Sequence, residues 1–248
     1  TLTVVALYGN YMLIVMGVQT LMTAMFNSMN AGIGNLVAEG DKRKIMSVFA
    51  ELFSIRFLFS CIMCFGVLMI TPAFVSFWIG KKYVMDSLSL LLMTAILFVN
   101  LSRTTVDAYI NAYGLFGDIW APIVEASLNV GLSIILGYYF GLHGVLSGVL
   151  ISLLLVVFCW KPYYLFRKGL DERLSIYIFM YARHLMAALL CGVIVCLGMR
   201  YSMVQGDTTF FDGLLGILVF SILSTLTLLC VAPGMRNLMR RFIRMCHV

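Results

Sequence analysis

The sequence predicts an all-α polytopic membrane protein with about seven transmembrane helices. Of its residues, 62% are hydrophobic and only 11% are charged, whereas soluble domains contain about 25% charged residues. A helix that spans a bilayer needs about 20 apolar residues, so a chain of 248 residues holds about seven of them with short loops. Little remains for a water-soluble basic face, so nucleic acid is not an expected partner.

Apolar runs interrupted by Gly, Pro or charged residues define the predicted helices in order. They span Val4–Val37, Lys44–Ile70, Val84–Tyr113, Asp118–Phe140, His143–Leu165, Ser175–Met199 and Phe210–Val231. Thr71-Pro72 is expected to end the second helix, because proline lacks the amide hydrogen that continues a helix. Gly114 and Gly117 end the third helix, and Pro233-Gly234 ends the seventh. Asp118 is the expected N-cap of the fourth, since its carboxylate can accept from free amides of the first turn.

Basic residues collect in alternate loops, which must face the same side of the membrane. One set of loops, with the tail, holds ten: Lys42, Arg43, Lys44, Arg167, Lys168, Arg173, Arg236, Arg240, Arg241 and Arg244. The other set holds three: Lys81, Lys82 and Arg200. By the positive-inside rule, this excess predicts a cytoplasmic C-terminus and a first helix that begins on the outer side.

The chain is interpreted as one transmembrane lobe, residues 1–248, with a short amphipathic cytoplasmic tail at 234–248. The tail alternates arginines with apolar residues: Arg236, Leu238, Met239, Arg240, Arg241, Phe242, Ile243 and Arg244. One interpretation is an interfacial helix on anionic lipid. The other is a frayed basic tail that only stops translocation.

Polar side chains form stripes inside the predicted helices, where ionisable groups are costly unless they face a partner or a wet cavity. The third helix carries Asn100, Arg103, Asp107 and Asn111, whose spacing places them on one face. The first carries Thr20, Thr23, Asn27 and Asn30, the second Glu51 and Arg56, and the fourth Glu125 and Asn129.

The depth of these groups suggests a cavity. Counted from the helix ends, Arg56 and Arg103 lie roughly 18 Å deep, and Glu51, Asp107 and Glu125 roughly 10 to 12 Å deep. We interpret the set as a water-filled cavity for an anion such as phosphate or pyrophosphate, which arginine grips with two hydrogen bonds. In the alternative interpretation, Arg103 and Asp107 neutralise each other and only tie helices together.

Other residue types indicate packing rather than chemistry. Gly141, Gly144 and Gly148 are expected to let helices approach closely, and His143 and His184 to lie near helix ends. The Cys61–Cys64 pair, which has redox spacing, is interpreted as two buried small hydrophobic residues, with a redox or metal pair as the alternative. No nucleophile–base pair, metal-ligand spacing or phosphate-binding glycine loop is found, so neither an enzyme nor a cofactor is predicted.

Four stretches, in order, carry a family resemblance. They are Tyr8–Tyr11 with Phe26–Asn35 and Ala38–Lys42; Trp78–Tyr83; Tyr113–Pro122; and Leu128–Ser133 with Gly141–Val145 and Gly148. Over about residues 4–168 the chain resembles the polysaccharide and lipid-linked oligosaccharide (O-antigen-type) flippases of the multidrug/oligosaccharidyl-lipid/polysaccharide exporter superfamily. The last two helices resemble this family in hydropathy only.

This resemblance implies a two-lobe transporter of the bacterial cytoplasmic (inner) membrane. On that template the chain is the C-terminal lobe without its first helix, and the N-terminal lobe is a missing partner. The family implies alternating access, with the sugar–pyrophosphate headgroup in a central cavity, the lipid tail in the bilayer, and ion or proton coupling. Membrane lipids, the lipid-linked oligosaccharide and polysaccharide assembly proteins are the expected partners.

Chemistry and depth then suggest roles for the polar residues. Arg56 and Arg103 are expected to bind the phosphates. The sugar hydroxyls are assigned to the amides of Asn27, Asn30, Asn100, Asn111 and Asn129. The carboxylates expected to carry coupling ions or to orient the arginines are Glu51, Asp107 and Glu125.

Two other functions compete with this one. A multidrug exporter of the same superfamily would have a more acidic and aromatic cavity without paired arginines. A membrane-embedded polysaccharide polymerase or acyltransferase would place polar residues in a large outer loop, yet the longest one, Arg200–Thr209, offers only Gln205 and Asp207.

Overall fold

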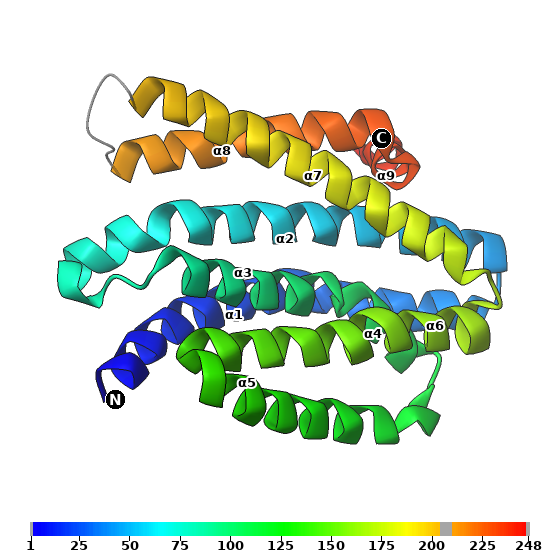
Figure 1. Cartoon of the computed structure of the whole chain (residues 1–248). Coiled ribbons are helices and arrows are strands. Elements are labelled where there is room, and N and C mark those ends of the chain that lie inside the picture. Colours follow the sequence, from blue (N-terminus) through cyan, green and yellow to red (C-terminus); the bar gives the residue numbers. More distant parts are fainter. Residues whose placement is uncertain (1, 204–209, 247–248) are drawn as a thin grey trace.

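The computed structural model describes residues 2–203 and 210–246, which form a bundle of helices running side by side (Figure 1). No β-strand occurs in these ranges, and six stretches are long and apolar enough to span a membrane. The all-α membrane class is therefore confirmed. Gln205 and Asp207, and the side chain of Arg200, lie outside what the structure describes.

Nine α-helices and four shorter helical turns make up the described ranges. They are α1 (Leu2–Glu39), α2 (Lys42–Trp78), η1 (Lys81–Tyr83), α3 (Ser87–Ser102), α4 (Thr104–Ala112), η2 (Phe116–Asp118), α5 (Trp120–Leu153), η3 (Leu154–Trp160), α6 (Lys161–Leu165), η4 (Phe166–Leu170), α7 (Leu174–Met203), α8 (Phe210–Val231) and α9 (Pro233–Cys246). The turns η1 and η2 are 3₁₀-helical, and η3 and η4 are π-helical.

The fourth and fifth predicted helices are the two arms of one hairpin, which explains six apolar stretches in place of seven. The 55-residue stretch Phe116–Leu170 reverses at Gly141, whose φ of 60° and ψ of −133° leave the helical region. The Ser133 hydroxyl donates to the Val145 carbonyl at 3.3 Å across the arms. A Cβ on Gly144 would lie 1.9 Å from a backbone oxygen of the facing arm, so glycine there permits the close packing.

Two predicted helix ends are wrong. The α2 helix continues through Pro72 to Trp78, because a proline removes one hydrogen bond while the turns on both sides keep theirs. Asp118 does not cap α5, which begins after Ile119 without a side-chain cap. Its carboxylate instead accepts a hydrogen bond from Trp160 Nε1 at 3.1 Å.

The third predicted helix is interrupted at Arg103, which ends α3 and precedes α4. Asp86 caps α3 by accepting from the Ser89 amide at 3.0 Å, and it also contacts His143 Nε2 at 2.7 Å. Arg103 itself keeps helical backbone angles, so α3 and α4 together form one apolar stretch, Ser87–Ala112.

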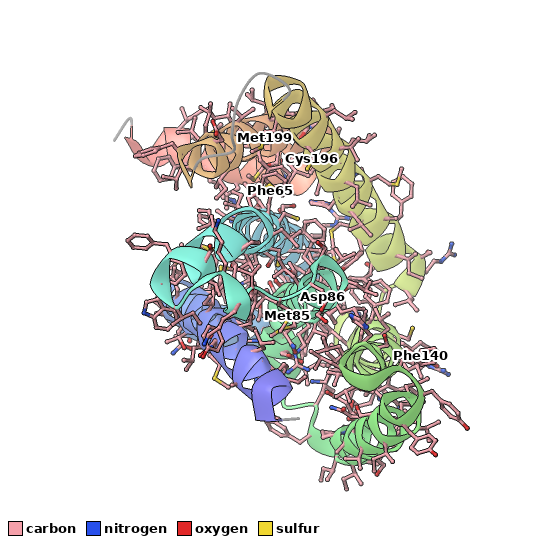
Figure 2. The ribbon with its side chains drawn as sticks, turned by 60° about the vertical axis from the view of Figure 1, so that its left-hand side comes forward. Phe65, Met85, Asp86, Phe140, Cys196 and Met199 are labelled. Atoms are coloured by element: carbon pink, nitrogen blue, oxygen red, sulfur yellow. The ribbon has the colours of Figure 1, made fainter. Side chains whose placement is uncertain are left out.

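The core is built around α2, which packs against α1, α3, α8 and α9. Phe49, Phe53 and Phe57 recur every four residues and are buried on one side of α2. Farther along, Phe65 stacks on Phe220 of α8 with ring centroids 4.3 Å apart, and Met199 of α7 packs against the same cluster (Figure 2). The bundle is thus held mainly by apolar contacts.

His184 lies inside α7, not near a helix end as predicted. It is fully buried, with Nε2 2.9 Å from the Ser54 hydroxyl and Nδ1 2.7 Å from the Met180 carbonyl. Cys61 and Cys64 are free and buried, in the manner expected of small hydrophobic residues. Among the described residues, no group of His, Cys, Asp and Glu is arranged to hold a metal ion.

Candidate functional site

Polar residues of three helices line one cavity, of about 190 Å³, which we call the α1–α4 groove. Its polar lining consists of Thr23, Asn27 and Asn30 from α1, Arg56 from α2, and Thr104, Asp107 and Asn111 from α4. Apolar residues, among them Phe26 and Leu101, complete the wall. Five of the ten predicted site residues therefore meet in one place.

Arg56 is the most buried polar group of the groove, with 2% of its surface exposed. Its Nη1 donates to the Thr104 carbonyl at 3.0 Å, and its Nη2 donates to Asn30 Oδ1 at 3.0 Å and to the Phe26 carbonyl at 3.4 Å. The guanidinium also lies 5.3 Å from the Phe26 ring centroid. Within the described residues, Nε has no hydrogen-bond partner and no carboxylate pairs with Arg56.

A second group of charges, which we call the Asp107 network, adjoins the groove. Asp107 contacts Lys161 Nζ at 2.8 Å and Arg103 Nε at 3.4 Å, and Arg103 Nη1 lies 4.0 Å from Glu125. Two positive and two negative groups thus balance one another. All four side chains are partly buried, with exposed fractions between 19% and 30%.

Lys161 is the member of this network that sequence reasoning missed. It is the single Asp, Glu, Lys or Arg residue in the predicted fifth helix, and that isolation was the available signal. It begins α6, directly after the π-helical turn η3. Such turns are frequent at functional sites.

The remaining predicted site residues lie outside the groove. Glu51, 3% exposed, pairs with Arg241 of α9 at 3.3 Å and accepts from the Ser47 hydroxyl. It therefore orients neither Arg56 nor Arg103. The Asn100 amide donates to the Ile96 carbonyl of its own helix at 3.1 Å.

Asn129 lies in the α5 hairpin, where it accepts from the Ser133 hydroxyl at 3.2 Å. Glu125 belongs to the same arm of the hairpin and reaches only the edge of the Asp107 network, through Arg103. Glu125 thus connects two helices, whereas Asn129 bonds within its own arm, and neither contributes to the groove wall.

Aromatic side chains indicate the level of these groups in a membrane. Trp120 and Trp160 lie together, with ring centroids 4.6 Å apart, and the exposed Phe140 ends the same arm of α5. Trp120 and Phe140 are separated by twenty residues of helix, a length of about 30 Å, which matches the thickness of the hydrocarbon core of a bilayer. We call Trp120 and Trp160, which mark one membrane interface, the aromatic row. Since Lys161 follows Trp160 and pairs with Asp107, the Asp107 network lies near the aromatic row. It is therefore shallower in the membrane than the depth counted from the helix ends.

The end of the bundle with this aromatic row is also the basic end, which carries Arg43, Lys168 and Arg173. It lies on the right in Figure 1, with α9 and the α1–α2 connection. The opposite end carries Asp86 and the reversal at Gly141; Figure 2 labels Asp86 and Phe140, the neighbour of Gly141. Comparison with protein-family models, curated proteins and solved structures finds no match to this chain.

Proposed function

We propose that this chain is one lobe of a transporter that moves a lipid-linked oligosaccharide or polysaccharide precursor across a membrane by alternating access. The α1–α4 groove binds the sugar–pyrophosphate headgroup. The amides of Asn27, Asn30 and Asn111 meet sugar hydroxyls. The other lobe faces α1.

The observation that carries this proposal is the uncompensated positive charge of Arg56. The groove lining contains two charged side chains, Arg56 and Asp107. Asp107 is already neutralised by Arg103 and Lys161, so the groove keeps the positive charge of Arg56. Buried charges are normally paired because an unpaired one is costly. An anionic ligand in the groove beside the guanidinium supplies the missing counter-charge.

The exposed polar face of α1 supports a second lobe or a water-filled space beside the groove. Only 11% of the most apolar part of α1 is buried, the smallest share of the six apolar stretches. Asn27 and Asn30 are exposed on this helix, and polar side chains that faced lipid would be costly. A headgroup held there is in contact with water, while its lipid tail remains in the bilayer.

The Asp107 network supplies a candidate for coupling. Protonation of Asp107 or Glu125 would leave Arg103 and Lys161 without their counter-charges, which favours rearrangement of α4 and the hairpin. On this proposal, coupling acts beside the substrate groove, because Asp107 belongs both to the groove lining and to the Asp107 network.

The proposal places the protein in the bacterial cytoplasmic membrane, with α9 and the basic end on the cytoplasmic side. The excess of Lys and Arg at that end supports this orientation. Cysteine labelling of Lys168→Cys, with a reagent that does not cross membranes, tests it. Labelling from outside intact cells would contradict the orientation.

Transport is tested with the full-length protein in a strain that lacks its own polysaccharide flippase. Restored surface polysaccharide is expected, and its absence despite protein in the membrane would refute the proposal. The double variant Asn27→Ala/Asn111→Ala should reduce export. Asn35→Ala is the matched control, because Asn35 is an exposed amide of α1 outside the groove lining. Equal export by both variants would exclude the groove as the binding site.

A further inference from the structure

The α9 helix lies across the bundle at its basic end. Figure 1 shows α9 almost end-on, whereas α2 and α8 run across the view. Met235 and Leu238 pack against α2 and α8 near Leu58, and Gly234 lies against the backbone of Ala50. A helix perpendicular to the membrane-spanning ones lies parallel to the membrane surface.

The contacts of α2 set the level of α9 in the bundle. Arg56 donates to the Thr104 carbonyl, and the Phe49 ring lies 5.0 Å from the Tyr109 ring. Glu51, between them on α2, is therefore level with the segment of α4 that contains Asp107. That segment lies at the aromatic row, so the Glu51–Arg241 ion pair holds α9 at the level of a membrane interface.

The exposed part of α9 has an apolar stripe and a basic face. Met239, Phe242 and Ile243 have exposed fractions of 42%, 63% and 50%, and they continue the stripe that begins with the packed Met235. The arginines other than Arg241 are exposed and have no acidic partner in the described structure: Arg236, Arg240 and Arg244.

Arg183 of α7 lies beside α9 and adds a candidate phosphate-binding group to the exposed arginines Arg236, Arg240 and Arg244. Arg183 of α7 is partly buried, and its Nε has no hydrogen-bond partner in the described part of the chain. Its guanidinium lies 5.8 Å from the Phe179 ring centroid. Ala187, one turn farther along α7, packs in the same cluster as Met235, the neighbour of Arg236 in α9. Two neighbouring arginines without an acid form a site for a phosphate group.

We propose that α9 and Arg183 together bind the headgroups of anionic phospholipids, with a phosphate between Arg183 and Arg236. Phospholipid fits both features, because the arginines meet phosphates while Met239, Phe242 and Ile243 enter the hydrocarbon. An acidic protein would satisfy the arginines only. This inference is independent of the transported substrate.

The test uses full-length protein reconstituted in nanodiscs of phosphatidylcholine with or without phosphatidylglycerol. Association of spin-labelled phosphatidylglycerol is measured for the native protein and for the triple variant Arg236→Gln/Arg240→Gln/Arg244→Gln. The control, Arg43→Gln/Lys168→Gln/Arg173→Gln, removes the same charge from exposed positions at the same end. Each arginine near the surface contributes about a fivefold factor, so the α9 variant should lose roughly fivefold or more.

The outcomes separate a specific surface from general attraction. Loss in the α9 variant but not in the control supports the proposal, as does a smaller loss in Arg183→Gln alone. Equal loss in both triple variants would show a general charge effect and overturn it. Unchanged association in the α9 variant would also overturn it, whether or not the protein transports its substrate.

Discussion

The Lys161–Asp107 ion pair should stabilise the fold measurably, although it joins two charged groups near a membrane interface. At 2.8 Å, two unit charges in a medium of effective dielectric about 20 attract by about 6 kcal/mol before desolvation is subtracted. Exposed pairs contribute about 0.2–1 kcal/mol, and breaking a buried pair costs about 3–5 kcal/mol. Since the two side chains are 19% and 29% exposed, Lys161→Met should cost about 1–3 kcal/mol.

The neighbouring charges make this cost non-additive. Asp107→Asn leaves Lys161 and Arg103 facing each other without their shared carboxylate, so it should destabilise by about 2–4 kcal/mol. In the double variant Lys161→Met/Asp107→Asn, the remaining Arg103 still faces Glu125. The double variant should therefore be less destabilised than the sum of the single ones, with a coupling energy of about 1–2 kcal/mol.

Equilibrium unfolding in mixed micelles, by titration with a denaturing detergent, measures these free energies. Lys168→Met is the control, because Lys168 is exposed and lacks an ion pair in the described structure. It should change the free energy of unfolding by less than about 0.5 kcal/mol. Additive effects in the double variant, or a neutral Lys161→Met, would refute the assignment of the pair.

Two further predictions concern the opposite end of the bundle. Gly144→Val should prevent stable packing of the hairpin, since a Cβ there would lie 1.9 Å from a backbone oxygen. Gly131→Ala is the control and should be tolerated, because the space around Gly131 is open. Unfolding in mixed micelles compares the two variants, and equal stability would contradict the hairpin. Burial raises the pKa of Asp86 and is the largest single influence, but the hydrogen bonds with His143 and Ser89 and the charge of His143 together outweigh it and lower the pKa to about 2. A lowered carboxyl pKa stabilises the folded state at pH values above the ordinary pKa of about 4. About 1 kcal/mol of folding stability, discounted for exposure, should therefore be lost as pH falls from about 4 to 2. The same loss in the Asp86→Asn variant would exclude this carboxyl as the cause.

Composition could predict the helices because an apolar chain must satisfy its backbone within each segment. It could not predict their junctions. A proline inside α2 and a proline at the start of α9 have the same local chemistry, yet Pro72 continues a helix and Pro233 begins one. The difference comes from neighbouring segments, which pack on α2 beyond Pro72, where Val75 is fully buried in the core. Such contacts are not encoded in one segment.

Helical spacing predicted part of the groove. Asn27 and Asn30 share one face of α1, and Asp107 and Asn111 share one face of α4, and all four line the cavity. Asn100 was placed on the same stripe by assuming a continuous helix. In the structure the Asn100 amide instead donates to the Ile96 carbonyl of its own helix, and Asn100 does not line the cavity.

Depth was harder to predict, because α1 and α2 extend beyond the aromatic row. At about 1.5 Å per residue, the 37 residues of α2 span about 55 Å, well over the hydrocarbon thickness of about 30 Å. Counting inward from Lys44, the predicted start of this helix, therefore places Arg56 too deep. The contact of Arg56 with Thr104, one turn from Asp107, relates it instead to the aromatic row.

This shallower level changes how a lipid-linked substrate would reach the groove. A pyrophosphate at the level of the aromatic row lies where phospholipid phosphates already lie, so the headgroup need not cross hydrocarbon to meet Arg56. The loosely packed α1 forms one wall of the groove, and a lipid tail can remain in the bilayer beside it. On the proposed function, binding therefore requires little movement, and the energetically demanding step is the later passage of the headgroup past the apolar half of the bundle.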